Sequence, residues 1–110
     1  MNLFYGQIEW IINFLTFVGT IYILKGDIEN AEKELTKIAK LQECDKKIKV
    51  NTLIKLGTIK IQDISSKDSI DDALKWFDEA IKIDNENPDV YLHRAQVNKS
   101  INQFFILIRK

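Results

Sequence analysis

The stretch from Ala73 to Gln96, ALKWFDEAIKIDNENPDVYLHRAQ, decides the fold of this chain. Helical patterns flank the corner Asn-Glu-Asn-Pro, and Pro88 suits the first turn of a helix because it has no backbone N–H to leave unpaired. Small residues recur where two helices would touch, and large apolar residues fill the space between them. The small residues are Ala73, Ala80 and Ala95, and the large ones are Trp76, Phe77, Ile81, Ile83, Val90 and Tyr91. The stretch therefore predicts the second helix of one helical hairpin, a turn, and the first helix of the next hairpin.

The composition is that of one ordinary globular domain. Of the 110 residues, 45% are apolar and 29% are charged, which allows a core of adequate size. Sixteen basic residues balance sixteen acidic ones, and the zero net charge gives no electrostatic case for nucleic-acid binding. Four glycines and one proline argue against long loops and all-β designs. The single cysteine, Cys44, leaves no internal disulfide to form, and we expect it to fill space near a helix end.

One pattern recurs along the chain in three copies. A small residue returns every 38 residues, and in the first two copies a second small residue precedes a large apolar one by four positions. The recurring small residues are Gly19, Gly57 and Ala95, and the pairs are Ala31 with Leu35 and Ala73 with Phe77. This pattern, in which small residues let paired helices approach, is typical of the tetratricopeptide repeat (TPR), a helix–turn–helix of about 34 residues that stacks on copies of itself. The expected packing signature comprises Gly19, Tyr22, Gly26, Ala31, Leu35, Gly57, Ala73, Phe77, Ala80, Tyr91 and Ala95.

The predicted fold class is all-α, an antiparallel helix–turn–helix TPR solenoid of about two full repeats plus one extra helix. Helices are predicted over residues 3–25, 28–42, 46–62, 69–84 and 88–105. We expect one TPR-like domain over residues 1–110, with repeat one at about 12–45, repeat two at about 50–87 and a partial repeat three at about 88–105. The expected helix starts are Asp27, after the turn at Gly26, and Ser69, with Asp72 three residues on.

The N-terminal segment 3–24 is strongly apolar and approaches the length of about 20 residues that spans a bilayer. Gln7, Glu9 and Asn13 argue against a membrane span, because a carboxylate in lipid costs several kcal/mol. We favour a buried solenoid helix here. A small membrane-anchored protein that uses residues 3–24 as its span is kept as an alternative.

The tail Phe104-Phe-Ile-Leu-Ile108 contains five consecutive large apolar residues, a run without helical amphipathicity and with high β propensity. A solenoid that ends on such a surface exposes apolar side chains to water. The tail is therefore expected to fold back on the binding groove, to self-associate, or to come from an imperfect gene model.

In a TPR protein the first helix of each hairpin lines a concave groove. The expected groove residues are Thr16, Thr20, Ile54, Thr58, Ile61, Leu92 and Gln96. They are apolar or small and polar, which suits an extended or helical peptide with hydrophobic anchors. A cationic clamp for the acidic C-terminus of a chaperone is not expected, because Asn51 and Lys55 are its only matches and Asp89 would repel the ligand.

No catalytic residues, cofactor or metal ligands are expected. His93 has no second histidine or cysteine at metal-ligand spacing and no positioned nucleophile beside it. The acidic residues Asp68, Asp71 and Asp72 lack the glycine and the closing glutamate of a calcium loop.

Three segments carry a more specific resemblance: IYILKGDIENAEKELTKIAKL at 21–41, NTLIKLGTIKIQ at 51–62 and DNENPDVYLHRAQ at 84–96. In this order they resemble the large TPR receptor of the mitochondrial outer-membrane translocase, over about residues 17–103. The resemblance implies a fragment from the middle of a longer receptor that takes up hydrophobic preproteins.

The predicted function is protein binding without catalysis, as a fragment of a mitochondrial preprotein import receptor on the cytosolic face of the outer membrane. The expected partners are hydrophobic preproteins and, as a further option, other translocase subunits and a membrane contacted through the N-terminal apolar helix. The alternatives are a TPR co-chaperone or scaffold module of the cytoplasm and the small membrane-anchored protein described above.

Overall fold

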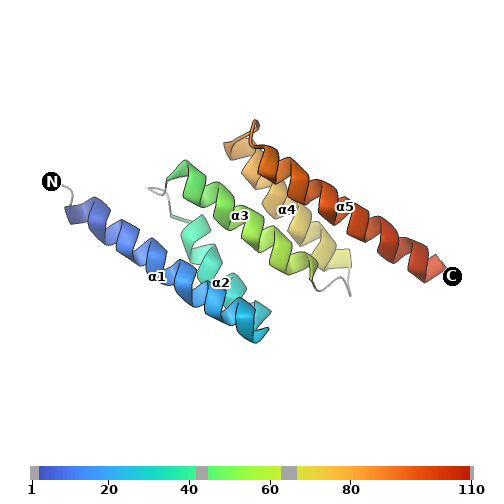
Figure 1. Cartoon of the computed structure of the whole chain (residues 1–110), viewed down its shortest axis with the longest axis horizontal. Coiled ribbons are helices and arrows are strands. Elements are labelled where there is room, and N and C mark those ends of the chain that lie inside the picture. The colour runs from blue at the N-terminus through green and yellow to red at the C-terminus, as the bar shows by residue number, and fades with distance from the viewer. Residues whose placement is uncertain (1–2, 42–44, 63–66, 110) are drawn as a thin grey trace. The chain divides into compact units, whose positions relative to one another are not determined.

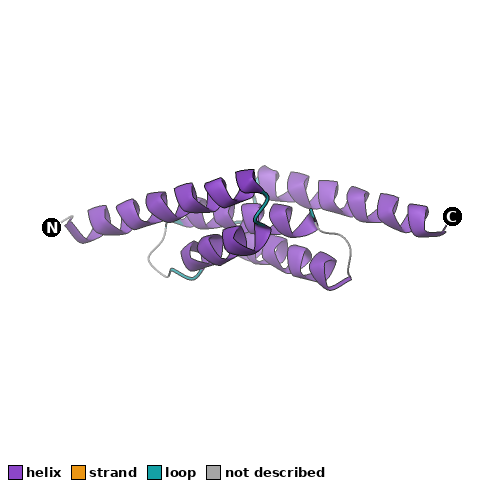
Figure 2. Cartoon of the chain, turned by 90° about the horizontal axis from the view of Figure 1, so that it is seen from below, coloured by secondary structure: helices purple, strands orange, loops and turns teal. Residues whose placement is uncertain are grey.

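The computed structural model describes residues 3–41, 45–62 and 67–109, and these residues form helices joined by turns. Figure 2 shows helices and loops throughout the described chain. The helices are α1 (Leu3–Lys25), α2 (Ile28–Ala39), α3 (Lys46–Ile61), α4 (Lys67–Ile83) and α5 (Pro88–Arg109). The all-α prediction is confirmed, and each predicted helix is present.

Three predicted boundaries need correction. Helix α2 ends at Ala39, because the N–H of Leu41 turns back to the carbonyl of Ile38 at 3.1 Å and tightens the last turn. Helix α4 begins at Lys67, so Ser69 lies inside its first turn and does not cap it. Helix α5 continues through the apolar tail to Arg109, which shows that the tail extends a helix already formed and does not fold back.

The chain divides into two compact units, residues 1–52 and 53–110, and α3 begins in the first and ends in the second. Each unit is described by itself. The expectation of one domain with three successive repeats stays a prediction about how these units work together.

In the first unit, α1 and α2 run side by side in opposite directions (Figure 1). Gly26 ends α1 with a φ of +79°, a left-handed conformation that favours glycine. The N–H of Gly26 binds the Ile23 carbonyl at 3.0 Å, and the N–H of Asp27 binds the Tyr22 carbonyl at 2.9 Å. These two hydrogen bonds form a Schellman motif, which reverses the chain within two residues.

Asp27 begins α2 as its N-cap. One carboxylate oxygen accepts from the backbone N–H of Asn30 at 3.2 Å, and the other accepts from the Asn30 side-chain amide at 2.7 Å. The Asn30 side-chain hydrogen bond, followed by the backbone one, lowers the pKa of the Asp27 carboxyl below its ordinary value of 3.8.

The core of the first unit lies between the facing sides of its helices. Its buried apolar side chains are Ile12, Ala31, Leu35, Ile38 and Val50. Gly19 is buried on α1, and a Cβ at this position would lie 3.1 Å from two carbons of Leu35. The absence of that Cβ therefore lets α1 approach α2.

The expectation that α1 is a buried solenoid helix is wrong for one of its faces. Trp10, Phe14, Phe17 and Leu24 are each more than half exposed. Their positions lie opposite the side that packs on α2, since they differ from Ile12 and Gly19 by about half a turn at 100° per residue. Within the described residues no helix, α1 included, is long and apolar enough to cross a membrane.

In the second unit, α4 packs against the end of α3 and against α5. A Cβ at Gly57 of α3 would lie 2.5 Å from Cε2 of the fully buried Phe77 on α4, so the phenyl ring sits directly on the glycine backbone. Arg94 of α5 forms a 3.2 Å ion pair with Asp78 of α4. The buried apolar side chains of this unit are Leu53, Ile54, Leu56, Ile59, Ile70, Ala73, Phe77, Ala80, Val90 and Val97.

The turn between α4 and α5 is held by side chains as well as by the backbone. The side-chain oxygen of Asn87 accepts from the N–H of Asp89 at 2.9 Å, which caps α5 with Pro88 at its first position. The Tyr91 hydroxyl donates to the Asn85 carbonyl at 2.8 Å. The corner quoted at the start of the sequence analysis is thus a real helix–turn–helix junction.

Candidate functional site

The seven expected groove residues fall into two groups. Two lie on α1 in the first unit, and five lie on α3 and α5 in the second unit. The first group is Thr16 and Thr20, and the second is Ile54, Thr58, Ile61, Leu92 and Gln96. Each group is described within its own unit, and their union into one groove stays a prediction.

Two of the three threonines, Thr20 and Thr58, present less polarity than the sequence suggests. The Thr20 hydroxyl donates to the Thr16 carbonyl at 2.8 Å, and the Thr58 hydroxyl donates to the Ile54 carbonyl at 2.8 Å. Since each hydroxyl hydrogen is used by its own helix, a ligand would meet a methyl group and an oxygen that can only accept.

The residues of the second group differ in accessibility. Ile54 is only 7% exposed, so its side chain belongs to the core and a ligand would not reach it. Thr58 and Ile61 are half-buried, while Leu92 is 55% exposed and Gln96 is exposed. Leu92 and Gln96 are one helical turn apart on α5, so their side chains are neighbours on one face. The accessible part of the second group is therefore an apolar and amide surface.

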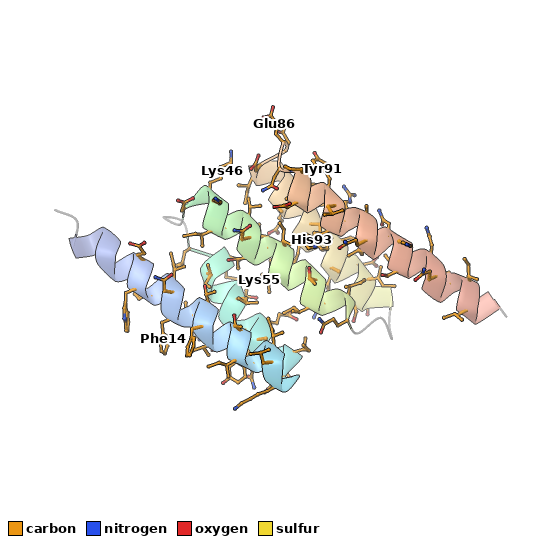
Figure 3. The ribbon with its side chains drawn as sticks, viewed as in Figure 1. Phe14, Lys46, Lys55, Glu86, Tyr91 and His93 are labelled. Carbon is orange, nitrogen blue, oxygen red and sulfur yellow. The ribbon has the colours of Figure 1, made fainter. Side chains whose placement is uncertain are left out.

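Two sets of exposed apolar side chains on α5 were not among the expected groove residues. Tyr91 is 45% exposed although its hydroxyl is fixed on Asn85, so its ring offers an ordered apolar surface near the turn (Figure 3). Phe105, Ile106 and Leu107 are exposed on the last turns of the same helix. The sequence showed both sets as apolar residues, but it did not show on which side of a helix they would stand.

Ala95 occupies a different environment from the two glycines with which it aligns. Gly19 is covered by Leu35 of the next helix, and Gly57 is covered by Phe77 of the next helix. Ala95 is exposed, and no helix among the described residues covers it. The shared repeat position therefore produces close helix packing only where a second helix follows.

The charged groups near this surface are few. Asp89 is exposed at the start of α5, His93 is half-buried, and Lys55 is exposed on α3 (Figure 3). Arg94 is engaged with Asp78 at 3.2 Å. Asp89 adds a negative charge one turn before Leu92, and the exposed Lys99 adds a positive charge one turn after Gln96, so no cluster of cations forms on this face of α5.

A shallow depression is lined by α2 and its C-cap residue Lys40, and an outer helix surface of this kind encloses no ligand. Its residues are Glu29, Glu32, Lys33, Glu34, Thr36, Lys37 and Lys40. Among the described residues no group of three or more His, Cys, Asp or Glu side chains could hold a metal ion. Cys44 lies outside the described residues.

Comparison with known proteins places this architecture in a class. A family model of the TPR repeat matches residues 66–101, which contain α4, the corner at Pro88 and the first part of α5. This match shows a TPR repeat over these residues, and with the helices of the described chain it agrees with the predicted all-α fold class of a TPR solenoid.

The chain is similar to the mitochondrial import receptor subunit TOM70. It is 33% identical to the human protein over 95 residues, which cover 86% of this chain and 15% of the human protein. It is 35% identical to the rat and mouse proteins over 92 residues, which cover 84% of this chain and 14% of each relative. The chain thus spans about one-seventh of the length of these curated relatives. No solved structure matches it.

Proposed function

We propose that this chain is a non-enzymatic protein-binding module, part of a receptor that takes preproteins to mitochondria. The observation that carries the proposal is the similarity to import receptor subunits over 86% of the chain, in an architecture of TPR hairpins. Its site of action would be the cytosolic face of the mitochondrial outer membrane. Its partners would be hydrophobic preproteins and other translocase subunits.

The chemistry of the second unit supports a hydrophobic ligand. Leu92 supplies an exposed apolar anchor, Gln96 supplies an amide that both donates and accepts, and Thr58 and Ile61 are half-buried on α3. A ligand helix or an extended segment would place apolar side chains on Leu92 and satisfy Gln96 with a backbone group. In this proposal Thr16 and Thr20 are the corresponding ligand-binding residues of the first repeat.

The charge of α5 disfavours the co-chaperone alternative. Capture of an acidic C-terminus requires arginine or lysine side chains directed at a carboxylate. On α5 the exposed Asp89 precedes Leu92 by three residues, which places a negative charge on the turn before the anchor. The exposed Lys99 lies one turn beyond Gln96, so this face of α5 carries one charge of each sign and no pair of cations. An uncharged hydrophobic segment therefore suits this surface better than an acidic one.

Binding measured with the whole chain tests the proposal. Fluorescently labelled hydrophobic preprotein segments and an acidic chaperone C-terminal peptide would be titrated with the protein, and anisotropy would be recorded. We expect the hydrophobic segments to bind and the acidic peptide to bind at least ten-fold more weakly, a difference of about 1.4 kcal/mol. The opposite order would support the co-chaperone alternative and contradict the proposal.

A matched pair of variants locates the surface. Leu92→Glu places a carboxylate on the proposed anchor, whereas Leu107→Glu makes the same change at another exposed leucine on α5. The two positions are about 22 Å apart along the helix. We expect Leu92→Glu to weaken binding at least ten-fold and Leu107→Glu to change it less than two-fold. Equal effects at both positions would show that binding uses general apolar exposure and not this face.

A further inference from the structure

Helix α5 carries the third copy of the recurring small residue without the helix that covers the first two copies. Leu35 of α2 covers Gly19 on α1. Phe77 of α4 covers Gly57 on α3 in the same way. Ala95 stands at the equivalent position of α5, 38 residues after Gly57, and it is exposed. The two covered copies therefore show what kind of structure fits against the third.

The neighbours of Ala95 show the same difference in exposure. Leu53 and Ile54 of α3 are only 1% and 7% exposed. Tyr91 and Leu92, their equivalents 38 residues later on α5, are 45% and 55% exposed. The same repeat positions are thus buried on α3, which α4 covers, and open on α5. A single helix in a repeat protein cannot bury its own apolar face and needs a neighbour to cover it.

Ala95 stands at the centre of an exposed face of α5. The buried Val90 and Val97 lie about 140–160° from Ala95 around the helix, at 100° per residue, so this face is opposite the buried side of α5. Between residues 91 and 102, every side chain within about 60° of Ala95 is exposed. This Ala95 face consists of Tyr91, Leu92, Ala95, Asn98, Lys99 and Asn102. It offers two large apolar side chains beside a small residue, followed by polar ones.

We propose that the Ala95 face binds an amphipathic helix of another protein, one that carries a small residue and, four positions later, a large apolar residue. The two helices that cover Gly19 and Gly57 share this pattern. In α2 it is Ala31 with Leu35, and in α4 it is Ala73 with Phe77. All four of these side chains are at most 1% exposed. In the bound helix the large apolar side chain lies on Ala95, and the small residue one turn away lets the two backbones approach.

A second copy of this chain is a poorer occupant than another protein. Its two covering helices, α2 and α4, already use their pattern residues inside their own hairpins. Releasing either helix would expose the buried core of its own repeat to water. The inference goes beyond the proposed import function, because it depends only on the repeat position of Ala95 and not on the identity of a preprotein.

A peptide with the sequence of α4, residues 67–83, is the probe, since it carries the required pattern. A lactam bridge between Lys75 and Glu79 would hold it helical, because these side chains are exposed in α4, lie four residues apart and point away from Phe77. Fluorescence anisotropy with the full chain is expected to give a dissociation constant on the order of 10–100 μM, as one short helix buries little area. The same peptide with Phe77→Ala should bind at least ten-fold more weakly.

A matched pair of variants of the full chain locates the site. Ala95→Leu fills the place of the large apolar side chain and should weaken peptide binding at least ten-fold. Ser100→Leu makes a similar small-to-large change at an exposed position about 140° away around α5, and should change binding less than two-fold. Circular dichroism and thermal melts should be alike for the parent and both variants, because both positions are exposed.

Three results overturn the proposal. The first is the absence of binding at about 1 mM peptide. The second is binding that Ala95→Leu leaves unchanged or that both variants weaken equally, as expected if the peptide replaces α4 within the chain or binds without using this face. The third is a chain that dimerises without peptide and that Ala95→Leu makes monomeric, which would assign the Ala95 face to a second copy. Since the probe is not a preprotein, none of these results decides the proposed import function.

Discussion

Two glycines inside helices set how closely the hairpins pack, and their surroundings differ. At Gly19 an added Cβ would lie 3.1 Å from Cδ2 and Cγ of Leu35, a tight contact with a flexible aliphatic side chain. At Gly57 it would lie 2.5, 2.7 and 2.9 Å from three carbons of the Phe77 ring. Phe77 is fully buried, so its flat ring has no free volume into which it could move.

Gly19→Ala and Gly57→Ala should therefore change the free energy of unfolding in different directions or by different amounts. Alanine in a helix interior gains about 0.5–1 kcal/mol over glycine. At Gly19 this gain offsets a mild overlap, and we expect a free energy of unfolding within about 1 kcal/mol of the parent. At Gly57 the overlap with the ring should dominate and cost about 1–3 kcal/mol, and Gly57→Leu should cost at least as much. Urea denaturation followed by circular dichroism measures both values.

A second substitution identifies the cause of the Gly57→Ala loss. Replacing Phe77 with leucine removes ring atoms that lie against the new Cβ, so the double variant should lose less than the sum of the two single variants. Strict additivity would show that the loss at Gly57 does not come from contact with the ring.

At the scale of the element, the short turn between α1 and α2 depends on a charged cap. The folded pKa of Asp27 is lowered by the hydrogen bonds from the Asn30 side chain and backbone N–H, with smaller contributions from Lys25 and Lys33. The unfolded chain therefore binds this proton more tightly than the folded chain. The stabilisation is present above the ordinary pKa of 3.8 and is lost as pH falls through the lower, folded pKa.

Asp27→Asn tests this cap. Asparagine keeps a capping oxygen but has no charge, so the parent should melt at a higher temperature than the variant at pH 7. The difference between the two melting temperatures should shrink as pH falls below 3.8 and through the lower, folded pKa of Asp27. A difference that stays constant as pH falls through this whole range would show that the charge of Asp27 does not stabilise the fold.

A second prediction at this scale concerns the turn before α5. The 2.8 Å hydrogen bond from the Tyr91 hydroxyl to the Asn85 carbonyl ties α5 to the turn, and Tyr91→Phe should cost about 0.5–1 kcal/mol of unfolding free energy. The Arg94–Asp78 ion pair is half exposed, so Arg94→Gln should cost about 0.5 kcal/mol or less, and the loss should vanish in about 1 M salt. Chemical denaturation at low and high salt separates the two effects, because only the ion pair depends on salt.

At the scale of the whole molecule, each compact unit has its own buried core. Repeat proteins are stabilised by contacts within a repeat and with its neighbours, so damage to one core is expected to act locally. Phe77→Ala removes the largest fully buried side chain of the second unit and should cost about 3–5 kcal/mol. This is a large share of the roughly 5–15 kcal/mol of a typical domain.

Amide hydrogen exchange would show which helices are destabilised when the Phe77 side chain is removed. In Phe77→Ala we expect exchange to accelerate most in α4 and α5, and in the matched variant Leu35→Ala we expect the acceleration in α1 and α2. Uniform acceleration along the chain in both variants would mean that the two units unfold as one cooperative body.

The sequence alone determined the helices, the corners and the all-α fold class. Apolar periodicity, the glycine of the first turn and the proline of the last depend only on local geometry, so five helices were placed with few errors. The recurrence of a small residue at 38-residue intervals predicted the repeats, and the family match confirmed a TPR repeat over residues 66–101. The errors lay at the ends of helices. Helix α5, for example, continues through Phe104 to Arg109, because extending a formed helix needs no new nucleus.

Only the tertiary structure decided which side of each helix meets solvent. The sequence assigned Ile54 to a binding surface and α1 to the interior, but Ile54 is buried while Trp10, Phe17 and Leu24 are exposed. Both kinds of residue are apolar, and composition does not distinguish a helix face that packs against another helix from one that stays exposed to solvent. That distinction depends on which helix lies opposite, as Leu35 lies opposite Gly19 and nothing described covers Ala95. Packing between helices, and not the pattern within one helix, therefore fixed the surfaces on which function depends.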